Sequence, residues 1–512
     1  MAVTPLAVHR EVESYDLTIT HLDRAGKTTG NYSTTLVGLQ TFTFQDPYDA
    51  DGVAQVRLPK GRYGLNSYVF ELGEAGGVSA LAQPELVVDR NKRITVDARK
   101  ARPVVTTVPQ RSATPLLVDI GANFFGVDAS YSLGLWSFDF AGLSSGQLGR
   151  SVSAQQFVGT VSSQWADGQA PSSPYLYALS EGFPGRMPTG FVRHYRSTDL
   201  ATVVHRFRGG YPGMSAERAV FPELEWNTGG SAVILPTAVP GQRVEHYNTG
   251  HVRWGSELDF GVRGEDGWLE PKAVLISTPT AYRDGRTVTE TWNSAPYGPS
   301  FPTPRWPEQS ITRTVDTIFL DVPVHSDADG HPGGSLNDTA RTALYRNGTL
   351  VGESEYAGFG QFTVPGGAAN YRLETSATRG FTDLSTEVTT AWTFRSRHVA
   401  DDDPVRLPAM AVRFAPALRL DNSAPAGRAF VIPVQVQRQP GAPAANVAAL
   451  TVEVSYDGGK TWRKAGLDRQ GQGWAATVRH PAGAGYASLR ATARDTAGNT
   501  VTERIIQAYR LR

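Results

Sequence analysis

Hydrophobic and polar residues alternate in short runs along most of the chain. In residues 15–21, the side chains of Tyr15, Leu17 and Ile19 can face a core while the residues between them face water. A period of two residues is typical of a strand that is buried on one face. Similar runs recur, separated by Gly, Pro, Asn and Asp residues of the kind found in turns. The pattern predicts an all-β protein.

The runs and the breaks between them predict tandem β-sandwich domains. Residues 1–102 are expected to form a small sandwich, followed by a connector rich in proline and threonine. The region 115–400 is β-like and rich in aromatic residues, and its runs are compatible with one elaborate sandwich or with two. After an acidic break at 401–404, residues 411–512 are expected to form a sandwich of the immunoglobulin or fibronectin type, without its cysteine pair.

Composition narrows the classes of partner. The chain has 512 residues, too many for one ordinary domain of roughly 100–150 residues. Its 49 basic and 49 acidic residues balance, whereas binders of nucleic acid or of anionic membranes favour a basic excess. No apolar run reaches the roughly 18 residues of a membrane-spanning helix. We therefore expect neither a nucleic-acid partner nor a membrane partner.

The amino terminus and the lack of cysteine concern where in the cell the protein is found and which sites it can form. Arg10 and Glu11 occur before an apolar segment of signal-peptide length has formed, so the chain as written is expected to carry no signal peptide. It either stays inside the cell or is part of a longer exported polypeptide. Because the chain has no cysteine, disulfides, thiolate metal sites and a cysteine nucleophile are excluded.

One acidic segment is a candidate metal site. Asp327 and Asp329, at alternate positions in the segment 325–331, and Asp338 further along offer oxygen ligands of the kind that bind calcium. The same Asp-Ala-Asp-Gly string occurs at residues 49–52, where a plain turn suffices. A structural calcium ion held by these three aspartates and ordinary turn chemistry are the two interpretations. No other cofactor is expected.

Catalytic motifs are few. Residues 142–146 match Gly-x-Ser-x-Gly, which places Ser144 where a hydrolase elbow would have its nucleophile. Because no strand-turn-helix pattern surrounds it, we interpret this segment as a loop. The sequence has no P-loop and no His-Glu-x-x-His. We expect no catalytic residue, and a hydrolase with an unrecognised site stays as an alternative.

Aromatic residues suggest a binding surface. Trp226, Trp254, Trp268 and Trp292 lie in one β-rich stretch and could form a platform on which sugars stack, although large aromatic side chains more often pack in cores. Residues 455–462 resemble the Asp-box hairpin of sialidase propellers. A single copy predicts a hairpin with a packed tryptophan and does not predict a propeller.

Several segments resemble a known family. Residues 450–462, 489–499 and 508–511 look like the carboxy-terminal region of large secreted bacterial subtilisin-like serine peptidases. Residues 239–247, 344–356 and 391–396 are similar to the non-catalytic part of the same proteins, and residues 51–63 resemble transthyretin-like or carboxypeptidase-regulatory sandwiches. The family's catalytic signatures, Asp-Ser/Thr-Gly, His-Gly-Thr and Gly-Thr-Ser-x-Ala/Ser, do not occur in this chain.

The resemblance implies accessory modules of an extracellular peptidase, with no protease domain in this chain. Such modules would stabilise a peptidase catalytic domain, in cis or in trans, or bind a protein substrate or a cell-surface polymer. The alternative from another class is a carbohydrate- or cell-surface-binding protein. A strip of exposed aromatic rings would favour that alternative.

Overall fold

A computed structural model describes residues 12–73, 76–226, 228–400 and 402–512. Within these residues the regular structure is β-strand, apart from two 3-10 helices, η1 (Ala98–Lys100) and η2 (Ser197–Asp199). The prediction of an all-β protein is confirmed. No helix in the described ranges is long and apolar enough to cross a membrane.

The amino-terminal sandwich packs a three-stranded sheet on a seven-stranded sheet. The apolar face of β1 supplies Leu17 and Ile19, both fully buried against Leu65 and Leu81 of the larger sheet. The alternation in residues 15–21 therefore faces the core as predicted. The smaller sheet has the order β4 (Val53–Pro59), β1 (Ser14–Leu22) and β7 (Lys92–Asp97). The larger has the order β14 (Phe191–His194), β8 (Arg102–Thr107), β11 (Leu143–Gln147), β6 (Gly77–Val88), β5 (Gly61–Glu71), β2 (Tyr32–Gly38) and β3 (Phe44–Gln45).

Two strands of this larger sheet come from far along the chain. β11 pairs in parallel with β6, and β14 pairs in parallel with β8. Ser144 of the Gly-x-Ser-x-Gly match lies in β11 and is buried, so its interpretation as a loop is wrong. The sheet is covered on both faces, and a Cβ atom at Gly146 would lie 3.1 Å from Ala101 Cα. Small residues, which elsewhere mark a loop, are what this crowded strand requires.

A second seven-stranded sheet covers the other face of the first. The core between them includes Val37, Ala80 and Val104 on one side and Ile120 and Phe157 on the other. This sheet has the order β10 (Ser130–Ser137), β9 (Thr114–Phe125), β12 (Phe157–Ala166), β13 (Tyr175–Pro184), β19 (Gly241–Asn248), β15 (Leu200–Phe207) and β22 (Thr287–Trp292).

A six-stranded sheet packs against the second seven-stranded sheet. Leu176 and Val203 of the seven-stranded sheet meet Val220, Leu224 and Trp254 of the six-stranded sheet. Its order is β17 (Thr228–Gly229), β16 (Ser215–Leu224), β20 (Val252–Arg263), β21 (Leu269–Ile276) and β25 (Gly333–Ser335), and β18 (Leu235–Pro236) also pairs with β16.

The carboxy-terminal body has a nine-stranded sheet flanked by two four-stranded sheets. Its core includes the fully buried Trp392 and Tyr509. The large sheet has the order β27 (Thr349–Ser354), β26 (Thr339–Arg346), β29 (Ala369–Thr378), β30 (Glu387–Ser396), β40 (Thr500–Leu511), β39 (Gly485–Asp495), β35 (Val447–Ser455) and β36 (Arg463–Lys464), with β33 (Ser423–Ala424) paired to β40. One small sheet has the order β28 (Phe359–Thr363), β24 (Thr317–Asp321), β23 (Ser310–Thr314) and β31 (Val405–Arg406). The other has the order β32 (Met410–Phe414), β34 (Ala429–Arg438), β38 (Gly473–Arg479) and β37 (Gly466–Gln470).

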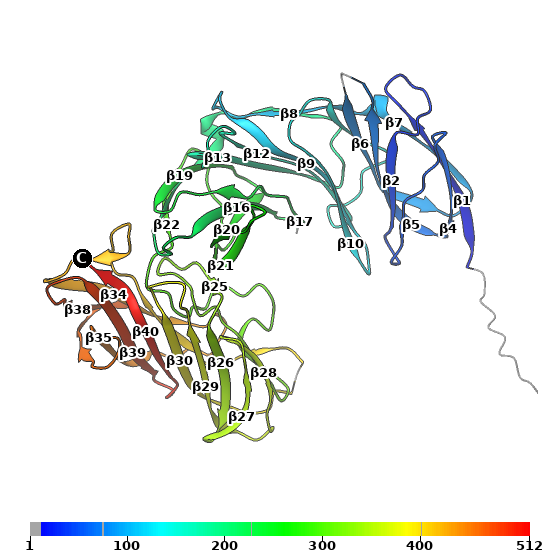
Figure 1. The fold of residues 1–512 in the computed structure, drawn as a ribbon. Coiled ribbons are helices and arrows are strands. Elements are labelled where there is room, and N and C mark those ends of the chain that lie inside the picture. Colours follow the sequence, from blue (N-terminus) through cyan, green and yellow to red (C-terminus); the bar gives the residue numbers. More distant parts are fainter. Residues whose placement is uncertain (1–11, 74–75, 227, 401) are drawn as a thin grey trace, which may run out of the picture.

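Hydrogen-bonded sheets join segments that the sequence separates. β30 pairs with β40 across the acidic break at 401–404, and β11 and β14 join the sheet of the first sandwich. The layers follow one another from the blue amino-terminal sandwich to the yellow and red carboxy-terminal body (Figure 1). The limits of independently folding domains, 1–102, 115–400 and 411–512, stay a prediction.

Candidate functional site

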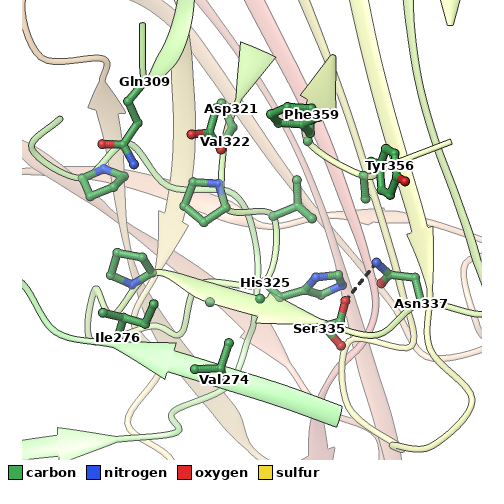
Figure 2. Close-up of a pocket in the computed structure, with 18 of the residues that line it drawn as sticks. Val274, Ile276, Gln309, Asp321, Val322, His325, Ser335, Asn337, Tyr356 and Phe359 are labelled. Atoms are coloured by element: carbon green, nitrogen blue, oxygen red, sulfur yellow. Dashed lines mark hydrogen bonds between the residues drawn. The ribbon is translucent and has the colours of Figure 1, made fainter. Parts of the chain in front are cut away.

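A groove opens where the six-stranded sheet meets the carboxy-terminal body. Its volume is about 950 Å³, and its lining comes from β21, β24, β25 and β28 and from the loops beside them. Figure 2 shows the arrangement, with Val274 and Ile276 of β21 on one side and Phe359 of β28 on the other. Pockets of roughly 300–1,000 Å³ bury ligands of drug size, so this groove is at the upper end of that range.

The floor of the groove is apolar and built from chain that other contacts hold in place. Val322 and Val324 follow β24, and Ile276 ends β21. The amide nitrogen of Ile276 donates to Pro332 O at 2.9 Å, which ties β21 to the segment before β25. The floor is therefore shaped before any ligand arrives.

Three aromatic side chains in the lining are open to solvent. Trp306, Tyr356 and Phe359 are 45%, 69% and 46% exposed, respectively. The rings of Tyr356 and Phe359 meet edge to face at 6.3 Å, and Phe359 also packs on Phe319 at 5.5 Å. Exposed aromatic rings gathered at one groove are a sign of a binding surface.

The turn that carries Tyr356 and Phe359 is fixed from beneath. Gly358 N donates to Thr375 Oγ1 at 2.8 Å, and Thr342 Oγ1 donates to Tyr356 O at 2.8 Å. Gly358 has a φ of +71°, and a Cβ atom there would lie 2.2 Å from Val322 O. Only glycine fits such a close approach at positive φ. The two rings are therefore presented on a rigid turn.

Two buried polar atoms at the groove have no hydrogen-bond partner. His325 is 3% exposed, and its Nε2 atom is unpartnered. Asn337 donates from Nδ2 to Ser335 O at 3.1 Å, but its Oδ1 atom accepts nothing. His325, Ser335 and Asn337 lie together in Figure 2. Burial holds the pKa of His325 well below its usual range, so the imidazole is neutral at physiological pH.

The aspartates that were candidates for calcium lie outside this groove and do not gather. Asp327 is buried and accepts hydrogen bonds from Asn293 N and from His331 N and Nδ1, each at 2.9 Å. Asp329 accepts from Ser294 Oγ, and Asp338 is exposed beside Gly380. Among the residues that the structure describes, no three His, Asp or Glu side chains are placed to hold a metal. Calcium binding by Asp327, Asp329 and Asp338 stays a prediction.

The turn-chemistry interpretation of residues 325–331 predicts that calcium leaves the stability of the protein unchanged. The N–H donors around Asp327 already satisfy its carboxylate, and an added cation would have to displace them. A site filled at a hundred times its Kd would raise the free energy of unfolding by about 2.7 kcal/mol. Thermal melting with calcium and with EDTA measures this difference. A higher melting temperature in calcium, lost in the Asp327→Asn variant, would contradict the expectation.

The four tryptophans named from the sequence do not form a platform. Trp254 and Trp292 are buried, and Trp226 packs partly buried on the core between the sheets. Trp268 is 72% exposed and lies outside the groove lining. Sequence reasoning missed Trp306, Tyr356 and Phe359. Trp306 and Tyr356 lie in bends outside the strands, where no alternation of polar and apolar residues marks them.

A cluster of ionisable side chains is sealed between the second and third layers. Arg218 of β16 donates from Nε to Glu245 Oε1 of β19 at 2.9 Å, and both side chains are fully buried. Tyr247 donates to the same carboxylate, and His205 Nε2 lies 3.1 Å from it. Arg218 also lies over the ring of Trp292 at 4.4 Å. Arg218, Glu245, His205 and Tyr247 are each at most 1% exposed, which fits an internal structural role for the cluster.

Ser144 of the Gly-x-Ser-x-Gly match is buried in β11. Ser144 donates to Val78 O at 3.2 Å and lies inside a sheet. In the described part of the chain, no hydrogen bond joins a serine hydroxyl to a histidine ring, whereas threonines do bond to His21, His194 and His246.

Comparisons with known proteins give distant likenesses. No protein-family model and no curated protein matches the chain. Solved structures that match include the fibronectin(III)-like modules of Clostridium thermocellum CbhA, 14% identical over 42% of this chain and 92% of that one, with a TM-score of 0.15. The major pilin subunit BcpA of Bacillus cereus is 10% identical over 55% of this chain and 99% of that one, with a TM-score of 0.13. A Salmonella alpha-2-macroglobulin is 8% identical over 97% of this chain and 40% of that one, with a TM-score of 0.19. We draw no functional conclusion from likenesses of this size, and the resemblance to subtilisin-like peptidases stays a prediction.

Proposed function

We propose that this protein is a non-catalytic accessory protein of the cell exterior that binds an extended polymer in its groove. The observation that carries the proposal is the preformed groove with the exposed rings of Trp306, Tyr356 and Phe359. The polymer is a protein substrate or a cell-surface polymer. The layered β-sheets act as a rigid support that presents the groove.

The groove lining favours binding over catalysis. A serine nucleophile needs an adjacent base to take its proton. The serines in the lining use their hydroxyl groups elsewhere: Ser277 Oγ accepts from Ser256 N at 2.8 Å, and Ser335 Oγ donates to Leu336 O at 2.9 Å. Neither hydroxyl group is bonded to His325, the histidine in the lining. This arrangement supports a binding role.

The likeness of residues 450–462 and 489–499 to the carboxy-terminal region of secreted subtilisin-like peptidases supports a place beside a peptidase. In this proposal, the catalytic domain lies on the same polypeptide or on a separate one, and the groove holds the polymer near it. An extracellular location is part of the proposal.

The test combines an activity probe with a binding assay on the purified chain. We expect no labelling by a fluorophosphonate and no digestion of casein, because no serine is paired with a base in the groove. We expect binding to at least one polymer among casein, gelatin, purified bacterial cell wall and neutral polysaccharides. The Trp306→Ala/Tyr356→Ala double variant should lose that binding.

Two outcomes would contradict the proposal. Stoichiometric labelling of one serine, lost when that serine is replaced by alanine, would make the protein a hydrolase. Polymer binding that the double variant retains in full would place the binding surface outside the groove. The Trp268→Ala variant is the matched control, because Trp268 is as exposed as Tyr356 and does not line the groove.

A further inference from the structure

We infer that the polymer bound in this groove is a neutral saccharide chain, with hydroxyl groups of one sugar ring bonded to Asn337 Oδ1 and His325 Nε2. The inference rests on the proposed function, because it names the ligand class of the same groove. Three features support the inference. Two buried polar atoms of the groove have no partner, exposed aromatic rings line the same groove, and the groove has few charged groups.

The unpartnered atoms define what the ligand must offer. A buried polar atom without a partner costs free energy, so native proteins rarely leave one unsatisfied. Asn337 Oδ1 can only accept a hydrogen bond, whereas His325 Nε2 accepts or donates according to its tautomer. A hydroxyl group both donates and accepts, so hydroxyl groups match both atoms in either tautomer. A carboxylate or a fully ionised phosphate has no proton to give Asn337.

The aromatic rings line the same groove as these atoms. Figure 2 places Tyr356, Phe359, Asn337 and His325 toward one end of the groove, and Gln309 and Ile276 toward the other. A pyranose ring has C–H groups on its faces and hydroxyl groups around its edge. Its apolar face can pack on Tyr356 or Phe359 while its edge hydroxyl groups reach Asn337 and His325. In this proposal, one aromatic ring together with Asn337 Oδ1 and His325 Nε2 forms a subsite for one sugar.

The charge of the groove does not favour an ionic ligand. Apart from Tyr356, its ionisable lining residues are Arg305, Asp321, His325 and Glu355. Burial raises the pKa of Asp321 and lowers that of His325, which shifts both toward their uncharged forms. Arg305 contributes one guanidinium and Glu355 one exposed carboxylate, so the lining has no cluster of like charges. Such a balance gives no electrostatic preference for a polyanion or a polycation.

The size of the groove indicates a chain of sugars. Its volume of about 950 Å³ is far more than one sugar ring occupies, and Gln309 and the exposed Trp306 extend the lining beyond the subsite at Asn337. An extended peptide would bind chiefly through main-chain pairing with a strand. Of the two edge strands in the lining, β25 offers only Gly333 to Ser335, and β28 contributes only Phe359 to the lining. The lining therefore favours the saccharide.

Affinity electrophoresis in native gels tests the inference on the full chain. The gels contain hydroxyethylcellulose, xylan, laminarin, soluble starch, galactomannan or glycol chitin. We expect at least one polysaccharide to retard the protein. Asn337→Leu should raise the apparent Kd by about tenfold, within the roughly 5- to 150-fold that the loss of a hydrogen-bonded group in a desolvated site produces. Tyr356→Ala should also raise it by about tenfold, because the sugar face loses the ring on which it packs.

Controls separate binding from folding. Tyr356 is 69% exposed, so Tyr356→Ala should keep the melting temperature, and the matched Trp268→Ala variant should keep both melting temperature and retardation. If Asn337→Leu lowers the melting temperature, Asn337→Ala replaces it. That variant removes the acceptor oxygen without adding bulk, so the hydroxyl group of the sugar loses its partner.

Each outcome decides between the inference and the function on which it rests. Retardation that falls in the Tyr356 and Asn337 variants supports the saccharide. If no polysaccharide retards the protein but casein or gelatin binds, with loss of binding in Tyr356→Ala, the inference is overturned and the proposed function stands. Retardation that neither variant changes overturns the inference by placing the sugar site elsewhere. No binding to any of these polymers overturns both.

Discussion

Replacing Arg218 with methionine is expected to lower the free energy of unfolding by about 3–5 kcal/mol. Arg218 and Glu245 are both fully buried and paired at 2.9 Å. Burial alone would raise the pKa of Glu245, but neighbouring positive charge, above all that of Arg218, outweighs it and holds this pKa well below its usual range. Without the Arg218 guanidinium, the buried carboxylate would lose its hydrogen-bonded countercharge and keep only Arg243, at 3.9 Å from Glu245 Oε1. Burial lowers the pKa of the neighbouring His205, which therefore stays neutral.

Urea unfolding at pH 7 measures this effect through the shift of the midpoint at constant m-value. The Arg218→Met/Glu245→Leu double variant is the control, since replacing both members of a buried ion pair by apolar residues is often close to neutral. It should recover much of the stability that the single variant loses. A single variant as stable as the parent protein would mean that water or protonation of Glu245 compensates for the missing charge.

Replacing Glu503 with glutamine is expected to make the protein more stable above pH 8, by a few kcal/mol at most. Burial raises the pKa of Glu503 from 4.5 to about 8. Its carboxyl group accepts from Val412 N at 2.7 Å, and its other oxygen is buried without a partner. The nearby Arg413 donates to backbone carbonyl groups, at 3.1 Å from Gly298 O and 2.8 Å from Pro299 O. Glutamine keeps an acceptor for Val412 and carries no charge.

Glu503 binds its proton more tightly in the folded protein than in the unfolded chain, and this difference makes the stability fall with rising pH. In the folded protein Glu503 keeps its proton up to about pH 8, whereas in the unfolded chain it loses the proton near 4.5. The stabilisation is therefore full below pH 4.5 and is lost as the pH rises toward 8. As the pH rises from 5 to 9, the urea midpoint of unfolding should fall for the parent protein and should fall less for the Glu503→Gln variant. Parallel curves for the two proteins would show that Glu503 does not titrate in this range.

The local order of polar and apolar residues predicted correctly those strands and turns whose structure depends on their own residues. The alternation through Leu17 and Ile19 gave the correct buried face of β1, because successive side chains of a strand point to opposite sides. The hairpin after β35 was also predictable. Asp457 Oδ1 accepts from Thr461 N at 2.9 Å, and Trp462 Nε1 donates to Gly459 O at 3.0 Å, so the motif holds the turn by itself.

The local order of polar and apolar residues did not predict strands whose partners lie far away in the chain. Ser144 reads as part of a loop, but it lies in a strand paired with β6, more than sixty residues earlier in the chain. A two-residue period encodes which face of a strand is buried and carries no information about its partner. The same limit applies to the sheet that joins β30 to β40 across the acidic break.

The all-β class, the buried faces of strands such as β1, and the turns held by their own side chains are encoded locally in the chain. The groove, in contrast, depends on tertiary packing. His325 and Asn337 come from loops on either side of β25, while Ile276 and Phe359 belong to different sheets. Their meeting depends on how two sheets pack, and packing arises from contacts between residues far apart in the chain, which no local period records.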